Sequence, residues 1–270
     1  VEEAGLLQGA LESLAAEGLS CTVWAEVPED PDIATIEAGR QLLEGCGADL
    51  IVGVGGGSPL CAAKDVAIVA TNGGSIADYE GSGKVKARPL PLIAVPTTAG
   101  SGTEVSAVTL AADPVRHVKM PIASPLNYPP VAILDPRLLL TLPRRQLGVS
   151  GIDALCHAIE AYLTTQATPL TDALAWNAVR LLARNMRRAA ETHDLEALDA
   201  CLLGSTMANM ACGNARLGLV HALSWPIACL FGTPHGLDNG ILLPYVLEFT
   251  RPAAVPRFAE LAGAMGEPVH

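Results

Sequence analysis

The stretch Asp49-Leu-Ile-Val-Gly-Val-Gly-Gly-Gly-Ser-Pro59 decides the fold. Its first half is apolar nearly throughout, as in a strand buried on both faces of a parallel sheet. Its second half places three glycines between that strand and a helix that begins near Pro59. Glycine lets backbone N–H groups approach an anion closely, and a helix N-terminus adds unpaired donors. The stretch therefore predicts a strand, a phosphate-binding turn and a helix, although a plain tight turn explains the glycines equally well and the G-x-G-x-x-G fingerprint is absent.

Strand and helix patterns alternate around this stretch. We expect helices over residues 1–17, 33–45 and 59–70, and strands over residues 21–25, 49–54 and 90–95. This alternation predicts a parallel, doubly wound sheet. After Leu147 the pattern changes to long helical segments at 150–165, 169–187, 195–212, 216–230 and 238–248. We therefore expect an α/β nucleotide-binding domain over residues 1–146 and an all-helical domain over residues 147–270.

The composition excludes several classes of protein. The chain has 270 residues, of which 50% are hydrophobic, enough for a substantial core in one or two domains. Its net charge of −11 argues against nucleic acid or an anionic membrane as a partner. No apolar run is long enough to span a bilayer. The cysteines number seven and form no C-x-x-C pair, which favours reduced thiols in a cytoplasmic protein.

The candidate metal ligands come from one helix and two separate histidine segments. Apolar residues recur at helical spacing through Gly151-Ile-Asp-Ala-Leu-Cys-His-Ala-Ile-Glu-Ala-Tyr162, so Asp153 and His157 share one helical face. His221 and His235 lie in mostly apolar surroundings. One carboxylate with three neutral imidazoles suits Fe(II) or Zn(II) better than Mg or Ca. Because lone buried histidines are more often hydrogen-bonded core residues, this pattern by itself leaves metal binding open. We expect the other histidines to lie away from this cluster: His117, His193 and His270.

A second glycine-rich segment follows the strand predicted at residues 90–95. In Pro96-Thr-Thr-Ala-Gly-Ser-Gly-Thr-Glu-Val-Ser106, the hydroxyls and glycines suit a pyrophosphate and a ribose. Neither Ser58 nor Ser101 lies in a G-x-S-x-G motif, so a serine hydrolase is not supported. Lys119 lies in a basic, strand-like stretch, where it is either a solvated lysine or a contact to a cofactor hydroxyl or phosphate.

Taken together, these segments resemble the iron-containing (group III) alcohol dehydrogenases, within the superfamily that includes glycerol dehydrogenase and dehydroquinate synthase. The resemblance covers nearly the whole chain and rests on long motifs in the family's order. The matching segments are Gly55-Gly-Gly-Ser-Pro59 with Ala63-Lys64, Pro96 to Val105, Gly151 to Tyr162, Leu217-Gly-Leu-Val-His-Ala222 and Pro234-His-Gly-Leu-Asp-Asn239.

The resemblance implies a reversible hydride transfer between a small alcohol, aldehyde or ketone and NAD or NADP. It implies metal ligands at Asp153, His157, His221 and His235, with Fe(II) as the metal and Zn(II) as the alternative. It implies cofactor contacts at Gly56, Gly57, Ser58, Thr97, Thr98, Ser101 and Lys119. We further expect a dehydroquinate-synthase-like architecture, a homo-oligomer, and no nucleic-acid or membrane partner.

The sequence also departs from the family pattern. Cys61 stands where the family usually has Asp, Trp225 where many members carry a further histidine, and Cys212 where an aromatic residue is frequent. We expect Cys212 and Trp225 to shape the substrate pocket. We assign no acid or base beyond the metal ligands, because Trp225 cannot transfer a proton. The start at Val1 and the end soon after a helical stretch predict truncation at both ends, with a first strand and the final helices missing.

Three alternatives stay open at this point. The first is a zinc polyol dehydrogenase of the glycerol type, within the same superfamily. The second is a dehydroquinate-synthase-like lyase, which the histidine segments match less well. The third is a non-catalytic, truncated homologue that acts as an assembly partner.

Overall fold

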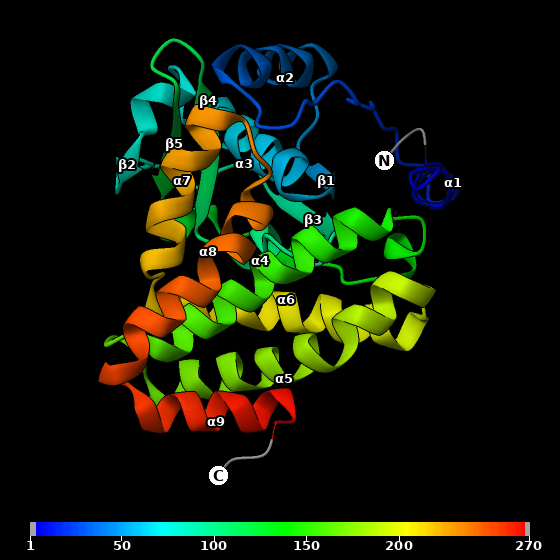
Figure 1. Cartoon of the computed structure of the whole chain (residues 1–270). Helices are drawn as coiled ribbons and strands as arrows, with labels where there is room; N and C mark the ends of the chain where they lie inside the picture. Colours follow the sequence, from blue (N-terminus) through cyan, green and yellow to red (C-terminus); the bar gives the residue numbers. More distant parts are fainter. Residues whose placement is uncertain (1–3, 268–270) are drawn as a thin grey trace. The chain divides into compact units, whose positions relative to one another are not determined.

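The computed structural model describes residues 4–267 (Figure 1). The chain divides into two compact units, Val1–Thr97 with Ala107–Ile133, and Thr98–Ser106 with Leu134–His270. Each unit has its own cluster of buried hydrophobic residues. The boundary expected between residues 146 and 147 stays a prediction.

The first unit contains the parallel sheet that the opening stretch predicts. Its strands are β1 (Ile51–Gly55), β3 (Leu92–Pro96) and β6 (Val131–Ala132), in the order β1-β3-β6. The register runs from Ile51 opposite Leu92 to Gly55 opposite Pro96. Helix α3 (Gly57–Asn72) connects β1 to β3 and packs against both strands (Figure 1). The predicted combination of an α/β region followed by helices is therefore confirmed.

A second small sheet in this unit was not foreseen. It contains β2 (Gly81–Ser82), β5 (Val118–Ala123) and β4 (Val108–Asp113), with β4 antiparallel to β5. Helix α2 (Ile33–Cys46) begins at Asp32, whose carboxylate accepts the Thr35 N–H, and it packs against α3. The short 3-10 helices here are η1 (Ile76–Tyr79) and η3 (Pro125–Asn127).

The prediction of a strand at residues 21–25 is wrong. These residues have no regular secondary structure, and all but Trp24 are exposed. Residues with strand propensity form a strand only where a neighbouring strand pairs with their backbone, and no described strand pairs with this segment. The helix expected at residues 1–17 is confined, among described residues, to α1 (Gln8–Ala16), which buries none of its side chains.

The second unit is helical, as predicted. Its α-helices are α4 (Arg144–Leu163), α5 (Pro169–Thr192), α6 (Leu195–Ala215), α7 (Leu219–Phe231), α8 (His235–Thr250) and α9 (Val255–Met265). Three 3-10 helices complete it: η2 (Thr103–Val105), η4 (Pro136–Leu139) and η5 (Arg251–Ala253). Within residues 4–267, no helix combines the length and the apolar character needed to cross a membrane.

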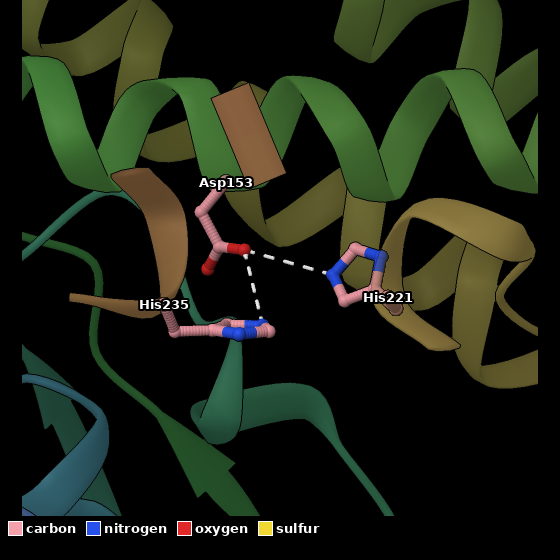
Figure 2. Close-up of side chains that lie close together, drawn as sticks. All are labelled: Asp153, His221 and His235. Atoms are coloured by element: carbon pink, nitrogen blue, oxygen red, sulfur yellow. Dashed lines mark ion pairs between the residues drawn. The ribbon is translucent and has the colours of Figure 1, made fainter. Parts of the chain in front are cut away.

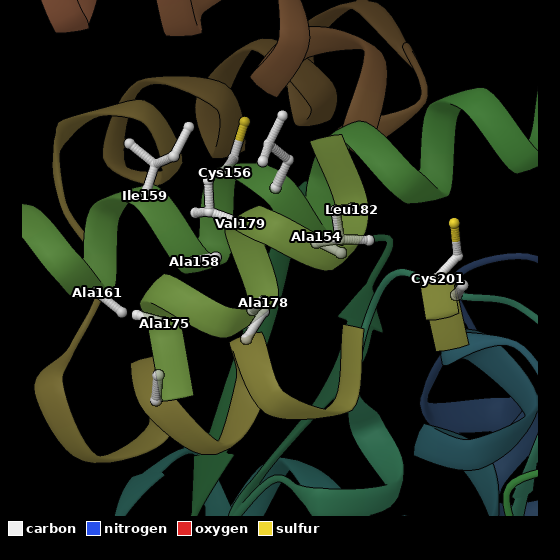
Figure 3. Close-up of a cluster of buried hydrophobic side chains, with 14 of the residues drawn as sticks. Ala154, Cys156, Ala158, Ile159, Ala161, Ala175, Ala178, Val179, Leu182 and Cys201 are labelled. Atoms are coloured by element: carbon white, nitrogen blue, oxygen red, sulfur yellow. The ribbon is translucent and has the colours of Figure 1, made fainter. Parts of the chain in front are cut away.

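Small side chains set the packing of α4, α5 and α6 against one another. Ala154, Ala158 and Ala161 of α4 are fully buried, as are Ala175 and Ala178 of α5 (Figure 3). Alanine lets helices pack closely because it adds no side chain beyond Cβ. The helix α4 that is packed in this way also carries Asp153 and His157, both of them buried.

Candidate metal centre

The four predicted ligands come together within the second unit. Asp153 and His157 lie one turn apart on α4, His221 lies in the first turn of α7, and His235 begins α8. The Asp153 Oδ1 atom lies 3.6 Å from His221 Nε2, 3.7 Å from His235 Nε2 and 4.0 Å from His157 Nε2. Figure 2 shows Asp153, His221 and His235 converging from three separate helices. The predicted helix and the two histidine segments therefore meet at one place.

These separations fit a single first-row ion. Two ligand atoms that are each about 2.1 Å from one ion lie about 3–4 Å from each other. The ligand atoms of Asp153, His221 and His235 all lie within 4.8 Å of one another. His157 is next to this trio, because its ring stacks on His221 with 4.5 Å between the ring centroids.

Burial and mutual contact shift the protonation of these groups. Burial lowers the pKa of His157 to about 4, so its imidazole is neutral at pH 7. Burial would also lower the pKa of His221, but hydrogen bonds to Asp153 and Glu160 outweigh it and raise this pKa to about 9. Burial would raise the pKa of Asp153, but the three histidines more than offset it, so this pKa lies below its usual range. At pH 7 the ion-free site is therefore a buried Asp153 carboxylate beside a protonated His221, and a cation that binds there would replace the Nε2 proton of His221.

Glu160 holds His221 in position from the next turns of α4. Its Oε2 lies 2.5 Å from His221 Nδ1, and its Oε1 accepts the backbone N–H of Val220 at 2.6 Å. Because Nδ1–H is donated to Glu160, Nε2 is the atom that would lose its proton and bind an ion. A Cβ at Gly218 would lie 2.8 Å from Glu160 Oε1, so the chain entering α7 needs a glycine there.

Two neighbouring polar residues were missed by the sequence reasoning. Glu160 follows Asp153 by seven residues and His157 by three, so it lies on the same face of α4, and this spacing is readable from the sequence. Asn239 follows His235 by four residues on α8 and is fully buried beside it. Its i,i+4 spacing from a predicted ligand is a signal that would have found it.

Within residues 4–267, the other histidines do not belong to this cluster. His193 ends α5, and its Nε2 lies 2.8 Å from the carbonyl oxygen of Leu142. His117 belongs to the other unit, where it precedes β5. His270 lies outside the described residues.

Four of the predicted cofactor residues lie at the carboxyl ends of β1 and β3. Gly56 and Gly57 start α3, with Ser58 after them, and the Thr97 N–H donates to the Gly55 carbonyl at 2.9 Å. Open α/β sheets bind ligands at the carboxyl ends of their strands. The position of these residues is consistent with the predicted phosphate-binding turn, and their role stays a prediction.

Lys119 is connected to Ser58 through a residue that was not predicted. The Lys119 Nζ lies 2.7 Å from Asp30 Oδ1, and the Asp30 backbone N–H donates to Ser58 Oγ at 3.1 Å. Asp30 has a positive φ of 54°. Because the Asp30 carboxylate is half exposed, its ion pair with Lys119 adds little to the stability of the fold. Asp30 is a neighbour of two predicted cofactor contacts, Ser58 and Lys119.

Thr98 and Ser101 belong to the helical unit, within the segment Thr98–Ser106. The glycines of this segment have a packing role that the sequence did not reveal. Gly102 has a φ of +56°, and a Cβ there would lie 2.0 Å from Asn209 Cγ on α6. The Asn209 side chain also donates to the Gly100 carbonyl at 3.2 Å. Gly102 therefore allows the backbone to lie against α6, and cofactor contact by Thr98 and Ser101 stays a prediction.

The residues expected to shape a substrate pocket lie on α6 and α7. Cys212 is buried, and burial together with the charges of Asp153 and Glu160 raises the pKa of its thiol to about 12. Trp225 follows His221 by one turn and is half-buried. Cys61, the other departure from the family pattern, is buried in α3, and its carbonyl accepts the Thr109 hydroxyl at 3.2 Å. Pocket formation by Cys212 and Trp225 stays a prediction.

Comparison with known proteins identifies the family. The family model described as iron-containing alcohol dehydrogenase matches residues 1–136, and the model for the C-terminal part of this family matches residues 148–269. An NAD-dependent methanol dehydrogenase of Bacillus methanolicus is 36% identical over 98% of this chain and 70% of its own length. A probable alcohol dehydrogenase EutG of Escherichia coli K12 is 40% identical over 98% of this chain and 67% of its own length.

Solved structures agree with this assignment. A crystal structure of a 1,3-propanediol oxidoreductase superposes with a TM-score of 0.96 at 36% identity, over 98% of this chain and 70% of the other. The chain therefore belongs to the iron-containing alcohol dehydrogenase family, a class of oxidoreductases that implies a metal ion, an NAD-type cofactor and a small alcohol or aldehyde as substrate.

Proposed function

We propose that the protein is a metal-dependent alcohol dehydrogenase that moves a hydride between a small alcohol and NAD or NADP. The observation that carries this proposal is the convergence of Asp153 with three histidines, each imidazole Nε2 within 4.0 Å of Asp153 Oδ1. We propose Asp153, His157, His221 and His235 as the ligands, and Fe(II) as the metal. Zn(II) is the second candidate, because the same donor set suits it.

The side chains around the cluster have separate tasks in this proposal. A bound ion supplies a Lewis acid that favours the alkoxide form of the alcohol. Glu160 keeps the His221 imidazole turned so that Nε2 faces the ligand cluster. Gly56, Gly57, Ser58, Thr97, Thr98, Ser101 and Lys119 bind and orient the cofactor. A bound nicotinamide would supply the acceptor for the hydride of the alcohol carbon, and the hydroxyl proton would pass to water or to a cofactor hydroxyl, because no side chain here is assigned as an acid or base.

Metal content and activity test the proposal together. Protein purified without added metal is analysed for iron and zinc, then assayed for cofactor reduction with a panel of small alcohols and added Fe(II), Zn(II) or Mn(II). We expect activity that depends on one of these metals and is lost in Asp153→Ala, while Asp199→Ala on α6 of the same unit retains it. Full activity in Asp153→Ala, or in protein stripped of metal, would contradict the proposal.

The cofactor assignment has a test of its own. Gly57→Val adds a branched side chain at the predicted phosphate-binding turn, and we expect it to weaken NAD(P) binding while metal binding is unchanged. Gly45→Val is the matched control, because a Cβ at Gly45 of α2 meets no atom within 4 Å. Equal cofactor affinity in the two variants, measured by calorimetry, would refute the assignment.

A further inference from the structure

Asn239 lies among the ligand atoms rather than at their edge. Its side-chain Nδ2 is 2.7 Å from Asp153 Oδ1, 3.1 Å from His221 Nε2 and 3.2 Å from His235 Nε2. These three partners come from α4, α7 and α8. One primary amide therefore lies within hydrogen-bond distance of a ligand atom from each helix.

The direction of this amide is fixed by chemistry. The shortest of the three contacts is to Asp153 Oδ1, a carboxylate oxygen that can only accept, so the amide presents its Nδ2 group to Asp153. With the amide turned over, its carbonyl oxygen would face the carboxylate oxygen, and no hydrogen bond to Asp153 would form. The Nδ2 group, with two hydrogens, is the end that matches this surrounding.

Burial of this amide costs free energy, which argues against a role in packing alone. Asn239 is fully buried, and its Oδ1 is a buried atom with no hydrogen-bond partner among residues 4–267. An unsatisfied buried acceptor typically costs about 1–3 kcal/mol, and an aliphatic side chain of similar size would avoid that cost. The hydrogen bond from Nδ2 to the Asp153 carboxylate offsets this loss.

We infer that Asn239 is a positioning residue for the metal site, which orients the Asp153 carboxylate and holds it beside the imidazoles of α7 and α8. This inference rests on the proposed metal site. Asn239 fixes the carboxylate so that Oδ1 faces the three imidazole Nε2 atoms, while the single lone pair of each Nε2 stays available to an ion. Residues that orient ligands in this way typically contribute 10- to 100-fold to metal affinity, so we expect a loss of about that size when the amide is removed.

The test measures metal affinity directly. Zn(II) is titrated against a chromophoric chelator, and Co(II) binding is followed by its visible absorption spectrum, in the wild type and in Asn239→Ala and Asn239→Leu. Asn239→Leu preserves volume, so it keeps the test valid if the alanine variant unfolds. Asn185→Ala is the control, because Asn185 lies on α5 of the same unit and its side chain donates to the Leu181 carbonyl within its own helix. Far-ultraviolet circular dichroism checks that each variant is folded.

We expect both Asn239 variants to bind Zn(II) about 10- to 100-fold more weakly and to shift the Co(II) spectrum, while Asn185→Ala matches the wild type. Wild-type affinity and an unchanged Co(II) spectrum in folded Asn239→Leu would overturn the inference. Asp153→Ala separates this failure from that of the proposed function. If Asp153→Ala also binds like the wild type, the metal is held elsewhere and both proposals fall, whereas loss of binding only in Asp153→Ala overturns the role of Asn239 alone.

Discussion

Glu160→Gln tests how much the carboxylate behind His221 contributes to metal affinity. The wild-type side chain accepts two hydrogen bonds, from His221 Nδ1 at 2.5 Å and from the Val220 N–H at 2.6 Å. Glutamine keeps the shape but has one acceptor oxygen, so its NH2 group must face one of these two donors. Leaving one buried donor unpaired costs about 1–3 kcal/mol of folding free energy. Loss of a group that orients a metal ligand costs about 10- to 100-fold in metal affinity.

Two measurements separate the two effects. Urea unfolding in the presence of a chelator gives the change in folding free energy, and Zn(II) competition titration gives the change in affinity. Glu260→Gln is the control, because Glu260 accepts a hydrogen bond from Tyr162 at the far end of α4 and bonds to none of the proposed ligands. If Glu160→Gln binds Zn(II) as tightly as Glu260→Gln and the wild type, Glu160 does not orient His221 and the geometric reasoning fails.

Two further predictions concern the framework around the site. Burial raises the pKa of Asp65 on α3 to about 8, so the folded protein keeps a proton on this carboxyl group that the unfolded chain releases. The free energy of unfolding should therefore fall by up to about 1.4 kcal/mol per pH unit as the pH rises from about 4 to 8. Asp65→Asn should remove this slope in urea unfolding measured across that range, and parallel pH profiles for the two proteins would argue against it. Gly102→Ala should destabilise by about 2–5 kcal/mol, because its Cβ would lie 2.0 Å from Asn209 Cγ in a left-handed backbone with φ +56°. Gly232 also has a left-handed backbone, but a Cβ there would meet open space, so Gly232→Ala should lower the free energy of unfolding by only about 1–2 kcal/mol. Equal losses for the two variants in chemical denaturation would show that the contact with Asn209 does not affect stability.

Local patterns predicted the parts of the fold that depend on local forces. The periodicity of residues 150–162 gave α4, and the i,i+4 spacing placed Asp153 and His157 on its buried face. Helices carry their hydrogen bonds within one segment, so their patterns are readable along the chain. The spacing of residues along the chain does not predict that α7 and α8 converge on α4. Only the family resemblance predicted that their histidines meet Asp153.

Features that depend on distant partners escaped prediction. Residues 21–25 have strand-like composition but no described neighbour to pair with, and the antiparallel pairing of β4 with β5 had no turn signal that was recognised. The role of Gly102 depends on Asn209, more than a hundred residues away. Asp30 joins Lys119 to Ser58 through contacts between segments far apart in the sequence. A single sequence does not indicate which distant residues will meet in this way.

The position of a bound ion tests most directly whether Asp153, His157, His221 and His235 bind one metal. Crystals grown with Zn(II) and measured at the zinc absorption edge would give an anomalous difference map of the whole chain. We expect one strong peak about 2.0–2.2 Å from a carboxylate oxygen of Asp153 and from an imidazole nitrogen of each of His157, His221 and His235. A fully occupied zinc peak elsewhere, with no density among these four side chains, would contradict it.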